Sequence, residues 1–130
     1  CVTRATASRM ACWNSGCGYC QSHMTNLSSL YQASDAKIAA LWNFEGSNLF
    51  NDAERAAIRL ALKAGEADFD VLKKHYDDDQ IVEIVASIAL FGYLNRWNAT
   101  MATTLEPLPA QVAERAIGAM GWTTGKHGHS

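Results

Sequence analysis

Apolar residues recur every three or four positions along most of this chain, and no segment alternates strictly between apolar and polar residues. This spacing gathers the apolar side chains on one face of a helix, so the pattern predicts an all-α protein of about six or seven helices. Breaks in the pattern separate the expected helices, which run over residues 2–14, 17–33, 37–42, 53–64, 69–76, 80–105 and 110–120.

Residues that favour helix ends stand at several of these breaks. Gly16 separates the first two expected helices, and Ser34 is suited to cap the start of the third. The acidic residues 77–79 suit the positive end of the longest helix, which follows them. Pro107 and Pro109 are expected to end that helix, because proline cannot continue the hydrogen-bond pattern of a helix interior.

The longest expected helix, residues 80–105, is apolar around most of its circumference. We therefore expect it to lie at the centre of the helix bundle. It is not expected to enter a membrane, because Glu83 interrupts its most apolar stretch and no run of 18 uncharged apolar residues occurs in the chain.

Composition favours one globular domain over residues 1–130. Apolar residues make up 48% and charged residues 18% of the chain, which argues against disorder and favours association of subunits. With a net charge of -2 and scattered basic residues, we expect no nucleic-acid partner. Residues 121–130 are glycine-rich and are expected to form a loose tail, for which Trp122 is the candidate anchor. Because the chain begins at Cys1 rather than at methionine, we expect a missing N-terminal segment.

All four cysteines lie within the first twenty residues. A secreted domain held by disulfides would distribute its cysteines so that they tie distant segments together. Clustering at one end instead indicates local thiol chemistry in a reducing compartment, so we expect a cytoplasmic protein. Cys12 could be a spare thiol near the site, but burial as a small apolar residue is the favoured interpretation.

The stretch Gly16-Cys17-Gly18-Tyr19-Cys20-Gln21-Ser22-His23-Met24 carries the candidate chemistry. On a helix, Cys17, Cys20 and His23 lie on one side, with the two sulfurs close together and the imidazole beside the second. Backbone N–H groups at the helix start are expected to lower the pKa of Cys17. Two thiols and an acid/base group suffice for a dithiol–disulfide cycle.

Other interpretations of the same residues stay open. Cys17, Cys20 and His23 could be three ligands of a structural zinc site, although no second ligand pair follows in the chain. The fourth ligand would have to be His75, His127 or His129. The two cysteines could also simply be buried as small apolar residues. Covalent haem is excluded, because Gln21 stands where the haem-binding motif requires histidine.

This stretch resembles the active-site signature of the AhpD-like, or carboxymuconolactone decarboxylase, superfamily, and in particular its peroxidase-related alkylhydroperoxidase branch. The resemblance extends over nearly the whole chain. It includes the helix start at residues 50–57, His75-Tyr76, the segment 81–98 that ends in Asn95-Arg96-Trp97-Asn98, and Gly121-Trp122 with Gly125-Lys126-His127.

The resemblance implies an AhpD-like helical bundle that forms a homo-oligomer and reduces hydroperoxides with electrons from a dithiol reductant, without a bound cofactor. By position in the motif, Cys20 would be the more buried thiol, which attacks the peroxide. Cys17 would be the more exposed thiol, which resolves the oxidised Cys20 and meets the reductant. His23 would relay protons.

One part of the family pattern is missing. The relay glutamate of the best-known members lies about a dozen residues before the first cysteine, where this chain has Arg4, Ala5 and Thr6. Glu54 is the first substitute to consider, although a glutamate there could merely stabilise its own helix start. The cysteine pair argues against decarboxylation, because the decarboxylases of the superfamily need no such pair.

Two alternative functions follow from the same residues. One is a general disulfide reductase with the same fold. The other is a non-catalytic helical oligomer that binds a metal or a partner through the stripe of Cys17, Cys20 and His23.

Overall fold

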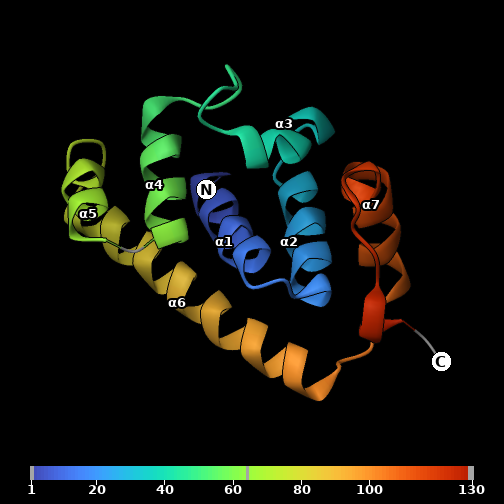
Figure 1. Ribbon diagram of the computed structural model, residues 1–130. Helices are drawn as coiled ribbons and strands as arrows, with labels where there is room; N and C mark the ends of the chain where they lie inside the picture. The colour runs from blue at the N-terminus through green and yellow to red at the C-terminus, as the bar shows by residue number, and fades with distance from the viewer. Residues whose placement is uncertain (1, 64, 129–130) are drawn as a thin grey trace.

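The computed structural model describes residues 2–63 and 65–128, and all regular secondary structure in these ranges is helical (Figure 1). This confirms the predicted all-α class. The described chain forms seven α-helices, namely α1 (Val2–Asn14), α2 (Gly18–Leu30), α3 (Asp35–Ala39), α4 (Asp52–Lys63), α5 (Glu66–Leu72), α6 (Asp78–Met101) and α7 (Pro107–Ile117). Three short 3₁₀ turns accompany them, η1 (Ala40–Asn43), η2 (Gly118–Met120) and η3 (Gly125–His127).

Side chains that favour helix starts cap α3 and α6, among other helices. The hydroxyl of Ser34 accepts a hydrogen bond from the backbone N–H of Lys37 at the start of α3. Asp77 and Gln80 form a reciprocal capping box at the start of α6. At its other end α6 stops at Met101 rather than at residue 105, because Ala102 adopts a left-handed conformation with φ of 49°.

The prediction that the two prolines end the longest helix is wrong, because Pro107 instead opens α7. Proline suits the first position of a helix, since the N–H that it lacks would have no acceptor within the helix. The connection between α6 and α7 therefore runs over residues 102–106 and carries Glu106 at its end.

The bundle is built around α1, which lies between α4 and α2 and also contacts α6 (Figure 1). The main buried cluster joins Met10 of α1 to Ile58, Leu72 and Ile84 of the helices around it. A second cluster beneath α7 contains Ile38, Leu105, Ile117 and Trp122.

Contrary to the prediction, α6 does not lie at the centre of the bundle. It runs along the lower edge of the molecule in Figure 1, with one side against α1 and α2. Only Ile81, Ile84 and Asn95 of α6 are buried, and apolar residues occupy much of its exposed side. No helix in the described part of the chain is long and apolar enough to cross a membrane.

The segment after α7 is packed against the bundle over residues 121–128 rather than loose, and Trp122 is the anchor, as considered from the sequence. The indole N–H of Trp122 donates a hydrogen bond to the carbonyl of Gly18 at 3.2 Å. The N–H of Leu105 donates to the carbonyl of His127 at 2.8 Å, and the His127 side chain is buried. Residues 129 and 130 lie outside the described chain.

Candidate active site

The turn between α1 and α2 brings three cysteines together. Gly16 adopts a left-handed φ of 70°, which only glycine takes readily, and this turns the chain from the end of α1 into α2. Cys12, Cys17 and Cys20 form one buried cluster with Met24. All three are free thiols, with at most 3% of each residue exposed, whereas Cys1 lies outside the described chain. The structure thus joins the predicted pair and adds Cys12 to it.

The sulfur of Cys20 lies among groups that stabilise negative charge. The thiol of Cys12 lowers the pKa of Cys20 most; burial opposes this, and Asn98, the Cys17 thiol and the charge of His127 lower it further. The amide nitrogen Nδ2 of Asn98 donates to Sγ of Cys20 at 3.5 Å. Together these groups lower the pKa of Cys20 from 9.0 to about 6, so this thiol is largely ionised at neutral pH.

The neighbouring thiols are protonated under the same conditions. Burial raises the pKa of Cys17 to about 11, against the opposing effect of the backbone N–H of Cys20. The pKa of Cys12 lies well above its usual range because of its hydrogen bond to Cys20 and its burial. The expected lowering of the Cys17 pKa by the helix start is therefore wrong, because desolvation outweighs the backbone N–H groups. Cys17 is also no more exposed than Cys20, at 2% against 3%.

His23 lies on the outer side of α2 and pairs with an acid that sequence reasoning missed. Its Nε2 lies 2.8 Å from Oε2 of Glu106, at the start of α7. The His23 ring also lies against Tyr19, with ring centroids 4.3 Å apart, and the Tyr19 hydroxyl donates to the same carboxylate at 3.4 Å. Burial lowers the pKa of His23 more than the charge of Glu106 raises it, so His23 is neutral at pH 7.

A second imidazole, that of His127, lies closer to the cysteine helix than its place in the C-terminal segment suggested. Its Nδ1 lies 2.8 Å from the carbonyl oxygen of Thr103, which can only accept, so Nδ1 carries the proton of the neutral ring. This leaves Nε2 as the basic nitrogen. The ring centroid is 5.8 Å from that of Tyr19, and the charge of His127 acts on Cys20.

A pocket of about 260 Å³ opens beside this site. Its walls combine the turn before α2 with the C-terminal segment, and they include Gly16, Gly18, Trp122, Lys126 and His127. The pocket therefore leads from solvent to the His127 ring and to the start of the cysteine helix.

Solved structures share the fold of this chain. No protein-family model and no curated protein matches the sequence. The unliganded debrominase Bmp8 is 30% identical over 88% of this chain, with a TM-score of 0.79. A protein of unknown function from Agrobacterium tumefaciens, named as a candidate antioxidant defence protein AhpD, is 21% identical over 81% of this chain, with a TM-score of 0.69. The chain has the AhpD-like fold.

The carboxymuconolactone decarboxylase superfamily shares the AhpD-like fold. A cysteine-to-alanine variant of Bmp8 in complex with 2,3,4-tribromopyrrole is 29% identical over 88% of this chain, with a TM-score of 0.80. This chain spans only 65% of the length of that debrominase and 77% of the Agrobacterium protein.

In this AhpD-like fold, Glu54 does not lie with the cysteines, and the expectation that it completes the relay is not met. Glu54 is 7% exposed at the start of α4, where Lys37 Nζ lies 2.7 Å from its Oε1 and the N–H of Asn51 donates to its Oε2 at 3.1 Å. Figure 1 places this helix start at the opposite end of the bundle from the turn between α1 and α2. These contacts hold Glu54 at the start of α4.

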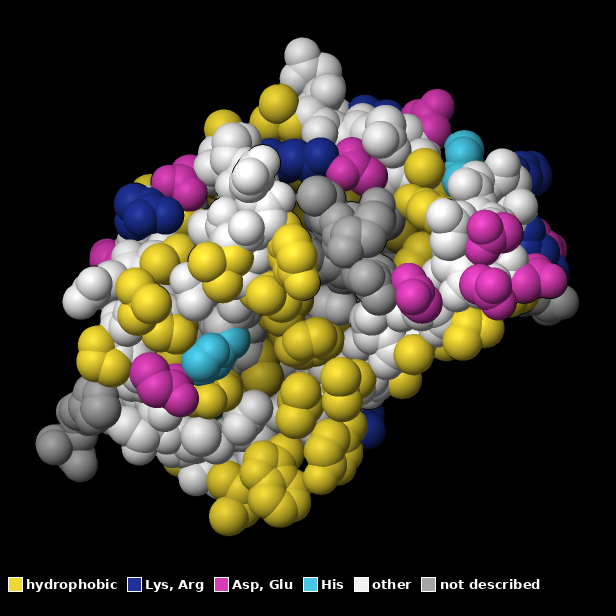
Figure 2. Space-filling view, turned by 180° about the vertical axis from the view of Figure 1, so that it is seen from behind, with side chains coloured by type: hydrophobic (Ala, Val, Ile, Leu, Met, Phe, Trp, Pro, Cys, Tyr) yellow, Lys and Arg dark blue, Asp and Glu magenta, His cyan; other side chains and the backbone are white. Residues whose placement is uncertain are grey.

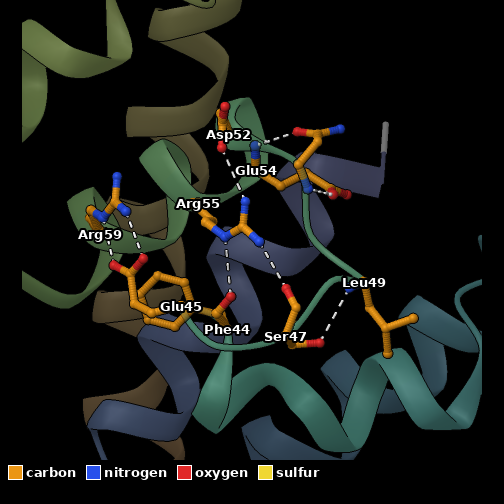
Figure 3. A network of polar contacts seen from close by, with 9 residues as sticks. Phe44, Glu45, Ser47, Leu49, Asp52, Glu54, Arg55 and Arg59 are labelled. Carbon is orange, nitrogen blue, oxygen red and sulfur yellow. Dashed lines mark hydrogen bonds and ion pairs between the residues drawn. The ribbon is translucent and has the colours of Figure 1, made fainter.

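Side chains of α4 near Glu54 hold the loop that precedes this helix (Figure 3). Arg55 donates from Nε to the carbonyl of Phe44 at 3.3 Å and from Nη2 to that of Ser47 at 2.8 Å. Arg59 forms a two-pronged ion pair with Glu45, with both contacts at 2.6 Å. These contacts fix residues 44–47 against α4.

No group of three or more histidine, cysteine or acidic side chains in the described ranges is arranged to hold a metal ion. The predicted zinc ligands diverge, because His23 is directed to Glu106 rather than to the two sulfurs. His129, another possible ligand, lies outside those ranges.

Proposed function

We propose that this chain is a thiol-dependent peroxidase, which reduces hydrogen peroxide or organic hydroperoxides through Cys20 and Cys17. One observation carries the proposal: an ionised thiol at Cys20 lies in one buried cluster with a protonated thiol at Cys17. A thiolate attacks the O–O bond, whereas a thiol does not. The shared fold with a candidate antioxidant defence protein agrees with this activity.

The cycle balances with these two residues and an external reductant. The Cys20 thiolate attacks one peroxide oxygen and becomes a sulfenic acid, while the other oxygen leaves and takes a proton to form an alcohol or water. The Cys17 thiol then attacks the Cys20 sulfur, so that a disulfide forms and water leaves. A dithiol reductant restores both thiols by exchange. The cycle needs a reducing compartment, and we assign the protein to the cytoplasm on this ground.

Two imidazoles would transfer the protons during the cycle. Nε2 of His127 would be the inner group: it would accept a proton when Cys20 ionises, pass it to the leaving oxygen, and then accept the proton of Cys17. His23 remains the outer relay, and Glu106 takes the role first considered for Glu54. Tyr19 lies between the two rings and joins them.

Single cysteine variants test the proposal. Cys20→Ser is expected to abolish peroxide turnover. Cys17→Ser is expected to consume one equivalent of peroxide and stop with a sulfenic acid at Cys20, detectable by dimedone labelling and mass spectrometry. Wild-type turnover in both variants would refute the proposal, and absence of turnover in the native chain would favour a non-catalytic oligomer.

Reductive debromination is a second candidate, because Bmp8 is a debrominase at 29–30% identity to this chain. A thiolate could attack the bromine of an electron-rich aromatic ring, and the ring carbon would take a proton. The second thiol would then displace bromide and leave a disulfide, so that an aryl bromide and two thiols give an arene, hydrogen bromide and a disulfide.

Substrate comparison with one reductant separates these activities. Hydrogen peroxide, an organic hydroperoxide, a bromopyrrole and a model disulfide would be supplied in turn with the same dithiol. Fastest turnover of a peroxide supports the proposal. Fastest turnover of the bromopyrrole favours debromination, and fastest turnover of the disulfide favours a general disulfide reductase.

A further inference from the structure

Thr103 follows the left-handed Ala102 at the end of α6 and contacts two residues that act on Cys20. The φ of 49° at Ala102, which is uncommon for a residue other than glycine, turns the chain back, so that the N–H of Thr103 donates to the carbonyl of Asn98 at 3.3 Å. The Thr103 hydroxyl donates to Oδ1 of Asn98 at 2.9 Å, and the Thr103 carbonyl lies 2.8 Å from Nδ1 of His127. Asn98 and His127 both act on the sulfur of Cys20.

We propose that Thr103 is a positioning residue for the chemistry of Cys20. Its hydroxyl holds the amide of Asn98 with Nδ2 toward the sulfur, and its carbonyl holds the His127 ring with Nε2 free to exchange protons. Thr103 acts through these two side chains rather than on the sulfur itself. The proposal rests on the peroxidase function proposed above, because it names the residue that orients two of the groups in that cycle.

The amide of Asn98 could face Cys20 in two ways. With Nδ2 toward the sulfur, the donor lies 3.5 Å from Sγ while Oδ1 accepts from Thr103. With the amide turned over, the lone pairs of Oδ1 would face a negatively charged sulfur, which cannot donate. The Thr103 hydroxyl stabilises the first orientation because it supplies Oδ1 with a donor. Without that donor, the amide would turn toward water and its hydrogen bond to Cys20 would weaken.

Backbone groups of residues 103–105 hold His127 from two sides. Its Nδ1 donates to the carbonyl of Thr103 at 2.8 Å, and its own carbonyl accepts from the N–H of Leu105 at 2.8 Å. Because a carbonyl can only accept, the neutral ring keeps its proton on Nδ1 and Nε2 is the base. Thr103 thus sets both the donor that faces the thiolate and the tautomer of the nearby imidazole.

The surface near the C-terminal end of α6 is apolar. Figure 2 shows hydrophobic side chains gathered along the lower edge of the molecule, where this end of the helix lies. Cys20 itself is buried. In surroundings that exclude water, a hydrogen-bond donor stabilises a thiolate more than it would in water. The direction of the Asn98 amide is therefore expected to have a measurable effect on Cys20.

The pH midpoint of Cys20 alkylation by iodoacetamide tests the role of the hydroxyl, and it needs no peroxide. Thr103→Val keeps the shape and the backbone carbonyl but removes the hydroxyl, and is expected to raise the midpoint by about half a unit to one unit. At a pH below the midpoint, this is a loss of about three- to tenfold in reactivity. Thr103→Ser keeps the hydroxyl and is expected to keep the native midpoint. An unchanged midpoint in the valine variant, or equal shifts in both variants, would overturn the proposal.

A double-variant cycle separates positioning from a general loosening of the site. Asn98→Ala removes the amide and is expected to raise the midpoint by itself. Thr103→Val added to Asn98→Ala is expected to cause no further shift, because the group that the hydroxyl holds is gone. A full additional shift in the double variant would show that Thr103 acts by another route, and would overturn the proposal.

Nitrogen chemical shifts of the His127 ring test the role of the carbonyl in the native chain, because they distinguish the two tautomers. A proton on Nδ1 is expected, and a proton on Nε2 would overturn the role assigned to the carbonyl. Failure of these tests in a chain that reduces peroxide would count against Thr103 alone. The expected midpoints in a chain without peroxide turnover would support Thr103 and count against the peroxidase function alone.

Discussion

Replacing Cys12 by alanine removes the group that most lowers the pKa of Cys20. Cys12 is fully buried, and its own pKa lies well above the usual range, so it stays protonated and donates to the Cys20 sulfur. Alanine keeps the helix and removes the donor. Serine keeps a donor of similar size, so Cys12→Ser is the matched control.

The size of the effect follows from the lowered pKa of Cys20. A shift from 9.0 to about 6 corresponds to about 4 kcal/mol in favour of the thiolate. Four groups lower the pKa of Cys20 and Cys12 contributes most, so its share is at least a quarter of the combined lowering, or about 1 kcal/mol. Cys12→Ala should therefore raise the pKa of Cys20 to about 7. At pH 6 the ionised fraction would fall from about half to roughly a tenth to a fifth.

Alkylation by iodoacetamide as a function of pH measures this pKa, because the thiolate is the reactive form. Digestion and mass spectrometry count modification at Cys20 separately from the other cysteines. We expect the midpoint to rise by about one unit in Cys12→Ala and by less in Cys12→Ser. An unchanged or lower midpoint in the alanine variant would refute the role assigned to Cys12.

The remaining predictions concern the pH profile and the two acids. Peroxide reduction by the native chain should rise with pH through about 6 and level off above neutrality, because the Cys20 thiolate forms over that range; a rise centred near 9 would contradict this. Glu106→Gln should lower the pKa of His23 further, because the carboxylate raises it. An NMR titration of the ring measures this pKa, and an unchanged value would show that the pair is not formed. Glu54→Gln should lower the free energy of unfolding in urea by roughly 1–3 kcal/mol through its weakened contact with Lys37, and leave the pKa of Cys20 unchanged. A changed Cys20 pKa in the Glu54→Gln variant would show that Glu54 acts on the cysteine site.

Local signals in the sequence predicted most helix boundaries, because caps and breaks act within a few residues. Gly16 and the capping residues of α3 and α6 lie where the pattern placed them. The apolar circumference of α6 misled the prediction of its position, since a helix that is apolar all round can be buried by its own chain or by another. Pro107 was ambiguous for a similar reason, because proline both ends one helix and opens the next.

The site itself depended on contacts between distant parts of the chain. Cys17 and Cys20 were predictable because their spacing is local. Glu106 and His127 were not, because each reaches the cysteine helix from more than eighty residues away and neither carries a local signal for that contact. The resemblance included His127 among its motifs, but the glycines around it suggested a loose segment.

Mass spectrometry of the protein after one equivalent of hydrogen peroxide tests the central claim most directly. The account predicts the loss of two hydrogen atoms and a disulfide between Cys17 and Cys20, with Cys12 still alkylated as a free thiol after unfolding. A disulfide that contains Cys12, a sulfenic acid that persists on Cys17, or an unmodified protein would contradict it.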